Sequence, residues 1–295
     1  MLLCASLMLF NITDFQKNIM RILLTYFVLF VCIPLASMSQ VNRNTPAAMV
    51  PGVTAHRGYS MAYPENTLKA FQAGIDARAD WVELDIHKSK DGQIVVSHDK
   101  NTKRASEIDL EIANTTYAEL LKVDVATEFR NKNKLTIQEC PPERMPLLSE
   151  ALKLMLRQSK VRLSIQPKMD CVAEAIAIVR KLNAEKIVGF NDASLPLMSK
   201  VKTLAPSIPV FWDRPATADI DADITIAKER GFERMVLHFS TITTEKINKI
   251  KSAGIQVGAW TVDDPKMMGQ LLRMGIERIY TNDPKLLIKV KNEGI

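Results

Sequence analysis

The sequence predicts a single (β/α)8 barrel with a small insertion after the second strand and its hairpin. Apolar, β-branched runs alternate with amphipathic stretches from residue 51 onward, and this alternation is typical of a parallel sheet covered by helices. Eight such strand–helix pairs can be assigned in about 250 residues, which is the usual size of a barrel of this kind. No glycine-rich nucleotide turn follows the first strand, and this disfavours the competing architecture, a doubly wound open sheet.

The predicted strands are short apolar segments bounded by polar or turn-forming residues. They cover residues 51–56, 81–87, 93–97, 161–166, 186–190, 208–212, 234–238, 255–261 and 277–281. Segment 93–97 is expected to form a hairpin with 81–87 around Asp91-Gly92. Eight strands therefore remain for the barrel.

The predicted helices follow these strands and carry recognisable start and stop residues. They cover residues 65–77, 147–158, 170–183, 194–204, 219–230, 242–252, 264–274 and 284–292. Pro64 precedes the first helix and is expected near its first turn. Gly254 and Gly275 follow two of the helices, as C-terminal caps do.

Residues 100–146 break the alternation of strands and helices. The segment is too long for an ordinary loop, so we expect a small insertion over one mouth of the barrel. Its polar run from Arg130 to Lys134 is expected to be a solvated loop.

The N-terminal segment has the pattern of a secretory signal peptide. A basic start at Met20-Arg21 precedes an apolar run and small residues, with Ser37 and Ser39 before the expected cut. We therefore predict a signal peptide over residues 1–39, with Met20 as the hypothesised start of translation, and a mature domain over 40–295. The protein is expected to be exported, periplasmic or secreted, with no stable membrane span after cleavage. A retained N-terminal anchor is the alternative.

The net charge of the chain indicates which class of ligand it suits. The net charge is +6, and Lys17, Arg21 and Asp14 leave +5 for the mature part. A mildly basic chain suits small anionic ligands, whereas nucleic acid is disfavoured because no dense Lys/Arg stripe is present.

Cys140 and Cys171 are equally compatible with a disulfide and with buried free thiols. The oligomeric state stays open.

Candidate site residues gather at the ends of the predicted strands, where barrels place their active sites. His56 ends the first strand, and Glu83, Asp85 and His87 alternate along the second. Alternate strand residues share one face, and two carboxylates there would suit a hard cation such as Mg²⁺ or Ca²⁺. An exposed edge strand would give the same alternation without a metal.

Further candidates follow later strands. His98 comes directly after the hairpin, and a pair of histidines beside carboxylates suits acid–base chemistry. Gln166 and Lys168 share a face, and a lysine suits a phosphate, although it could also be an ordinary surface lysine. Trp260 ends a strand as a ligand-facing wall or as core, and His238 is interpreted as packing.

Several of these motifs resemble the glycerophosphodiester phosphodiesterase family. The opening block "AHRGYSMAYPENTLKAFQAGIDARADWVELDIHKSKDGQIVVSHD" runs from Ala55 to Asp99. Later matches are "ERMPLLSEAL" at 143–152, "IQPK" at 165–168, "AWTVDD" at 259–264 and "YTNDP" at 280–284. They are spread in order over nearly the whole mature chain, so the resemblance is specific.

The resemblance implies roles for individual residues. It implies that His56 and His98 are the acid–base pair, with either assignment of acid and base. It also implies that Arg57 and Lys168 contact the phosphate and that Trp260 lines the substrate pocket. Glu83, Asp85 and Gln166 would hold one divalent metal ion, Mg²⁺ or Ca²⁺.

The chain departs from the family pattern at two of these positions. The family usually has glutamate where Gln166 stands and often has aspartate where Asn282 stands. A glutamine carbonyl can coordinate such an ion but adds no charge, which would weaken the affinity for metal.

The implied function is metal-dependent hydrolysis of glycerophosphodiesters to glycerol 3-phosphate and an alcohol. A related specificity for phosphoinositol or lysophospholipid head groups is an alternative. A barrel that binds phosphodiesters without catalysis is another. The presence of five expected site residues argues against it: His56, Glu83, Asp85, His98 and Lys168.

Overall fold

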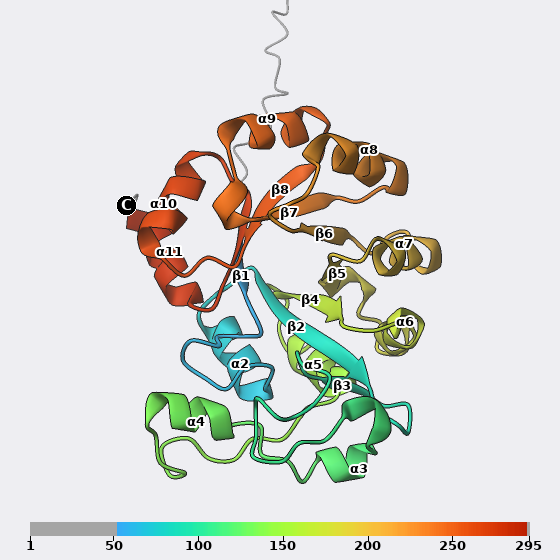
Figure 1. The fold of residues 1–295 in the computed structure, drawn as a ribbon, viewed down its shortest axis with the longest axis vertical. Coiled ribbons are helices and arrows are strands. Elements are labelled where there is room, and N and C mark those ends of the chain that lie inside the picture. The colour runs from blue at the N-terminus through green and yellow to red at the C-terminus, as the bar shows by residue number, and fades with distance from the viewer. Residues whose placement is uncertain (1–51, 294–295) are drawn as a thin grey trace, which may run out of the picture. The chain divides into compact units, whose positions relative to one another are not determined.

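The computed structural model describes residues 52–293, which form a closed eight-stranded parallel barrel (Figure 1). The strands are β1 (Gly52–Ala55), β2 (Trp81–Lys88), β3 (Ile94–Val96), β4 (Arg162–Pro167), β5 (Val188–Asp192), β6 (Val210–Arg214), β7 (Arg234–His238), β8 (Gln256–Trp260) and β9 (Arg278–Thr281). The strand order is β1-β9-β8-β7-β6-β5-β4-β2, and β1 also pairs with β2, which closes the ring. β3 pairs antiparallel with β2 and forms the predicted hairpin. The predicted fold class is therefore confirmed.

Helices follow the barrel strands and cover the outside of the ring (Figure 1). They are α2 (Leu68–Asp76), α5 (Leu148–Met155), α6 (Val172–Lys181), α7 (Leu195–Leu204), α8 (Ile220–Arg230), α9 (Thr244–Ser252), α10 (Pro265–Arg273) and α11 (Pro284–Glu293). Their apolar faces pack on the outer faces of the strands and form the main core of the molecule. Gly254 and Gly275 adopt φ of 78° and 91°, as predicted for residues that end helices.

The interior of the ring has a small apolar floor below a polar upper part. The floor is formed by Trp81, Phe211, Val236 and Tyr280. Glu83 and Asp85 lie further along β2 on the same face as Trp81 and are fully buried. The strand order therefore delivers polar side chains to one end of the barrel, where the strands finish.

Many predicted element boundaries differ from the structure by one to three residues, and three of these differences bear on the site. The first helix begins at Leu68 and not at 65, because Asn66 adopts a left-handed φ of 59° and Thr67 caps the helix by accepting a hydrogen bond from Ala70 N. β5 and β6 extend two residues beyond the predicted ends at 190 and 212. These two extensions bring Asp192 and Asp213 into the strands.

The insertion between β3 and α5 is more ordered than the sequence suggests. It contains a short 3₁₀ turn η1 (Ile112–Asn114) and the helices α3 (Tyr117–Leu120) and α4 (Thr127–Asn133). Its small core is formed by Val95, Ile112, Leu120 and Met145. Residues 130–133 belong to α4, so the predicted loop is wrong there, and Arg130 is buried and pairs with Asp124. Residues 131–134 are exposed, as predicted.

Two other sequence-based expectations can be compared with the described residues. Cys140 and Cys171 are buried free thiols, so the disulfide alternative is not adopted. Between residues 52 and 293 no helix is both long and apolar enough to cross a membrane. The predicted signal peptide at 1–39 lies outside the described part of the chain.

Candidate active site

The chain leaves β1 through a tight turn that carries two of the predicted site residues. His56 follows the strand directly, and Arg57 and Gly58 adopt left-handed φ values of 55° and 79°. A side chain at Gly58 would place a Cβ 2.6 Å from the carbonyl carbon of Ala70, so only glycine fits against this helix. The turn is held to β2 because Arg57 N donates to Glu83 Oε2 at 2.8 Å.

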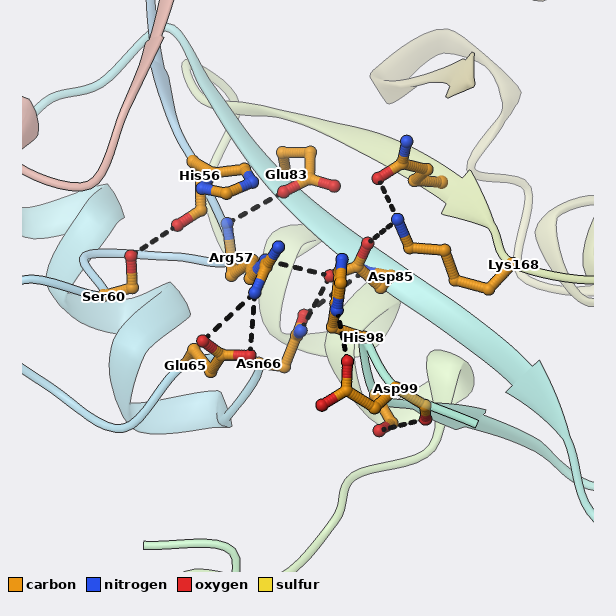
Figure 2. A network of polar contacts seen from close by, with 12 residues as sticks. His56, Arg57, Ser60, Glu65, Asn66, Glu83, Asp85, His98, Asp99 and Lys168 are labelled. Carbon is orange, nitrogen blue, oxygen red and sulfur yellow. Dashed lines mark hydrogen bonds and ion pairs between the residues drawn. The ribbon is translucent and has the colours of Figure 1, made fainter. Parts of the chain in front are cut away.

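Asp85 is the centre of the charged cluster (Figure 2). Arg57 Nε lies 3.4 Å from its Oδ2 and Lys168 Nζ lies 3.0 Å from its Oδ1, so two cations approach one buried carboxylate. Asn66, whose backbone is left-handed, adds a hydrogen bond from Nδ2 to Asp85 Oδ2 at 2.9 Å. Burial raises the pKa of Asp85, but the charges of Lys168 and Arg57 outweigh burial and lower its pKa overall.

Glu83 has the opposite electrostatic environment. It is fully buried, and burial together with the neighbouring charge of Asp85 raises its pKa well above the usual range. Its Oε1 is buried and has no hydrogen-bond partner. A buried carboxylate oxygen without a donor is costly, and a bound cation would relieve that cost.

Gln166 joins Lys168 to two aspartates that the sequence analysis missed. Its Oε1 accepts from Lys168 Nζ at 2.8 Å. Its Nε2 donates to Asp192 Oδ2 at 3.2 Å and to Asp213 Oδ2 at 3.3 Å. The two aspartates therefore fix the amide so that its oxygen points toward Lys168 and Asp85. The sequence signal for both residues was an aspartate within two residues of the end of an apolar run.

His56 is held in one orientation by Asn282, the other departure from the family pattern. Asn282 Nδ2 donates to Asp263 Oδ2 at 2.6 Å, so its Oδ1 faces His56 Nδ1 at 2.8 Å. An amide oxygen can only accept, so the proton of the imidazole is on Nδ1 and Nε2 keeps its lone pair. Burial and the charge of Arg57 lower the pKa of His56 to about 4, which keeps the ring neutral.

His98 lies near Asp85 and pairs with its sequence neighbour Asp99 (Figure 2). Its Nδ1 lies 2.6 Å from Asp99 Oδ1. Its backbone carbonyl is 3.2 Å from Nε2 of His87, so the third histidine of this region supports the backbone of His98. Each predicted acid–base histidine thus has its Nδ1 fixed by a neighbouring side chain.

The predicted metal set of Glu83, Asp85 and Gln166 has the chemistry that a hard cation requires. Asp85 and Gln166 are register partners on adjacent strands, and Glu83 lies two residues before Asp85 on the same face. All three offer oxygen atoms, which Mg²⁺ and Ca²⁺ prefer. Within residues 52–293 no group of three His, Cys, Asp or Glu side chains is arranged to hold a metal. The third ligand of the predicted set would be the amide oxygen of Gln166.

Trp260 and His238 lie side by side at the ends of β8 and β7. Their rings meet edge to face with centroids 5.3 Å apart, and His238 also stacks on Phe239. Trp260 is only half-buried, so it is not an ordinary core residue. His238 Nδ1 lies 2.8 Å from Ser240 Oγ, which agrees with a packing role.

The sequence matches the glycerophosphoryl diester phosphodiesterase family over residues 56–286. The chain belongs to this family. A glycerophosphodiester phosphodiesterase from Caldanaerobacter subterraneus is 28% identical over 250 residues, which cover 82% of this chain and 98% of that protein.

Solved structures of the glycerophosphodiester phosphodiesterase type share the fold. A putative member from Silicibacter pomeroyi gives a TM-score of 0.75 at 22% identity and covers 83% of this chain and 94% of its own. An Oleispira antarctica phosphodiesterase in complex with the product sn-glycerol-3-phosphate gives 0.71 at 24% identity, with 82% and 97% covered.

Family membership confirms the predicted resemblance and the predicted enzyme class, a glycerophosphodiester phosphodiesterase. The residue roles stay predictions, as do the metal and the location of the protein. The barrel brings His56, Arg57, Glu83, Asp85, His98, Gln166 and Lys168 to one mouth, which is the arrangement such roles require.

Proposed function

We propose that this phosphodiesterase hydrolyses glycerophosphodiesters to glycerol 3-phosphate and an alcohol with a divalent metal ion and two histidines. The observation that supports this most is the cluster around Asp85, where Arg57 and Lys168 contact one buried carboxylate and where His56 and His98 also lie (Figure 2). The two side-chain cations suit the charge that gathers on the phosphoryl oxygens in the transition state.

In this proposal His56 is the general base and His98 the general acid. The neutral ring of His56, with its proton on Nδ1, can accept a proton at Nε2 from a water that attacks phosphorus as the bond to the leaving alcohol breaks. If the neighbouring glycerol hydroxyl attacks instead, the cyclic phosphate that forms is opened by water in a second step. Asp99 holds the Nδ1 proton of His98, so His98 presents Nε2 to the leaving alcohol. Arg57 and Lys168 bind the phosphate oxygens, and Trp260 lines the pocket.

Glu83, Asp85 and Gln166 are proposed to hold the metal ion, Mg²⁺ or Ca²⁺. When bound, such an ion would polarise the phosphoryl oxygens as a Lewis acid. The unpartnered Glu83 Oε1 supports this assignment. We further propose that the substrate is a small diester and that the protein is exported after removal of residues 1–39.

The test is hydrolysis of glycerophosphocholine, glycerophosphoethanolamine and glycerophosphoinositol, each with Mg²⁺, Ca²⁺ or a chelator. We expect turnover of at least one diester and loss of that turnover with chelator. Undiminished turnover with chelator would contradict the proposed metal dependence. No turnover of any diester with either ion would contradict the proposed hydrolysis. A lysophospholipid in the same assay distinguishes the alternative specificity.

A further inference from the structure

Arg104 connects the insertion to both sides of the proposed active site. Its Nε donates to Asp99 Oδ2 at 2.6 Å, and its two terminal nitrogens contact both oxygens of Glu65 at 2.6 and 3.3 Å. The arginine fork thus spans two carboxylates that come from different parts of the chain.

Each of these carboxylates holds one proposed catalytic or phosphate-binding side chain. The other oxygen of Asp99 lies 2.6 Å from His98 Nδ1. Glu65 accepts from Arg57 Nη1 at 3.0 and 3.2 Å. A continuous polar chain therefore runs from His98 through Asp99, Arg104 and Glu65 to Arg57.

The charge of Arg104 matters as well as its geometry. Burial would raise the pKa of Glu65, but the hydrogen bond from Arg104 and the charges of Arg57 and Arg104 lower it, so Glu65 is an anion. Without Arg104, this anion and Asp99 would face Arg57 and the incoming phosphate with one less cation. Phosphate binding should then weaken.

We propose that Arg104 is a positioning residue through which the insertion orients His98, by way of Asp99, for proton transfer and orients Arg57, by way of Glu65, for phosphate binding. The inference rests on the proposed roles of these two residues. It assigns a function to the insertion, because Arg104 lies on it, in the loop between the paired residues Asn101 and Glu111. The group whose binding Arg104 would affect is the phosphate of the diester or of its product.

The structure offers a matched control on the same insertion. The Arg144 side chain is 46% exposed and that of Arg104 is 43% exposed, and each bonds both oxygens of one glutamate. Arg144 contacts Glu150 and Tyr117, which are not part of the proposed site. Arg104→Ala and Arg144→Ala therefore remove the same charge and a similar ion pair.

The experiment measures kcat and KM for the diester and the Kd of glycerol 3-phosphate in both variants. We expect Arg104→Ala to lose on the order of tenfold to a hundredfold in kcat/KM, because small displacements of reacting groups have effects of this size. The Kd should rise several-fold. Arg144→Ala should keep both values near those of the unmodified protein.

Chemical rescue separates positioning from a merely structural role. Because the Arg104 side chain is exposed, guanidinium ion added to the assay should restore part of the rate of Arg104→Ala and leave Arg144→Ala unaffected. Arg104→Lys keeps the charge without the fork and should be intermediate. Equal losses in both alanine variants, or a loss in Arg104→Ala that guanidinium does not restore, would overturn the inference.

Failure of the proposed function has a different signature. An unmodified protein that binds glycerol 3-phosphate but hydrolyses no diester would refute hydrolysis, and the Kd comparison would then decide the role of Arg104. A protein that binds no glycerol 3-phosphate would overturn both.

Discussion

At the scale of single residues, an amide stands at each of the two positions where the sequence departs from the family pattern. Asn282 donates to Asp263 and presents its oxygen to His56, while Gln166 donates to Asp192 and Asp213 and presents its oxygen to Lys168. An amide donates at one end and accepts at the other, whereas a carboxylate only accepts. At both positions the amide therefore donates to acidic neighbours, which a carboxylate could not do.

Asn282 is uncharged and lies beside His56. Replacing it with a charged residue should therefore shift the pH dependence of kcat/KM. Asn282→Asp should raise the pKa of His56 above its value of about 4, because an adjacent anion favours the imidazolium. A general base is lost as the pH falls through its pKa, so the acid limb of kcat/KM should move to higher pH. A pH–rate profile measures the shift.

Asn133→Asp is the control for the added charge, because Asn133 is exposed on α4. It should leave the acid limb in place. An identical profile for both variants would show that His56 is not the base.

At the scale of elements, adjacent strand ends decide which side chains can meet. Gln166 on β4 reaches Asp192 on β5 and Asp213 on β6, and Asn191 Nδ2 also donates to Asp213 at 3.1 Å. Burial raises the pKa of Asp213 to about 7, so a further carboxylate beside it would be costly. A glutamine at position 166 is therefore less costly than a glutamate, because it adds no carboxylate where these three strands end.

Gln166→Glu should therefore lower the free energy of unfolding. It removes two donated hydrogen bonds and places three carboxylates together, with an expected loss of about 2–4 kcal/mol in chelator near pH 7. Asp213→Asn in the same chain should recover part of the loss, because its new amide can donate to the introduced carboxylate. Urea unfolding of the single and double variants measures the coupling, and strictly additive losses would contradict the contact.

At the scale of the whole molecule, the sequence was sufficient to predict the barrel, because alternating strands and helices repeat with a clear period. It also predicted that the candidate site residues meet at one mouth, since barrel strands end there. The sequence did not identify Asp192 and Asp213 as site residues. A polar residue that follows an apolar run is assigned to a loop from sequence, although here both residues still belong to strands. Arg104 was missed because its two partners, Glu65 and Asp99, lie far apart along the chain and meet only in the fold.

The central claim is that His56 and His98 carry out the chemistry at the mouth of this barrel. The most direct measurement is the rate of glycerophosphodiester hydrolysis by His56→Ala and His98→Ala, with His238→Ala as the control on another barrel strand. We expect each of the first two changes to lower kcat by about 10²–10⁴-fold with the fold retained, as loss of a general acid or base does. His238→Ala should stay within a few-fold of the unmodified protein. Near-normal rates in either His56→Ala or His98→Ala would contradict the account.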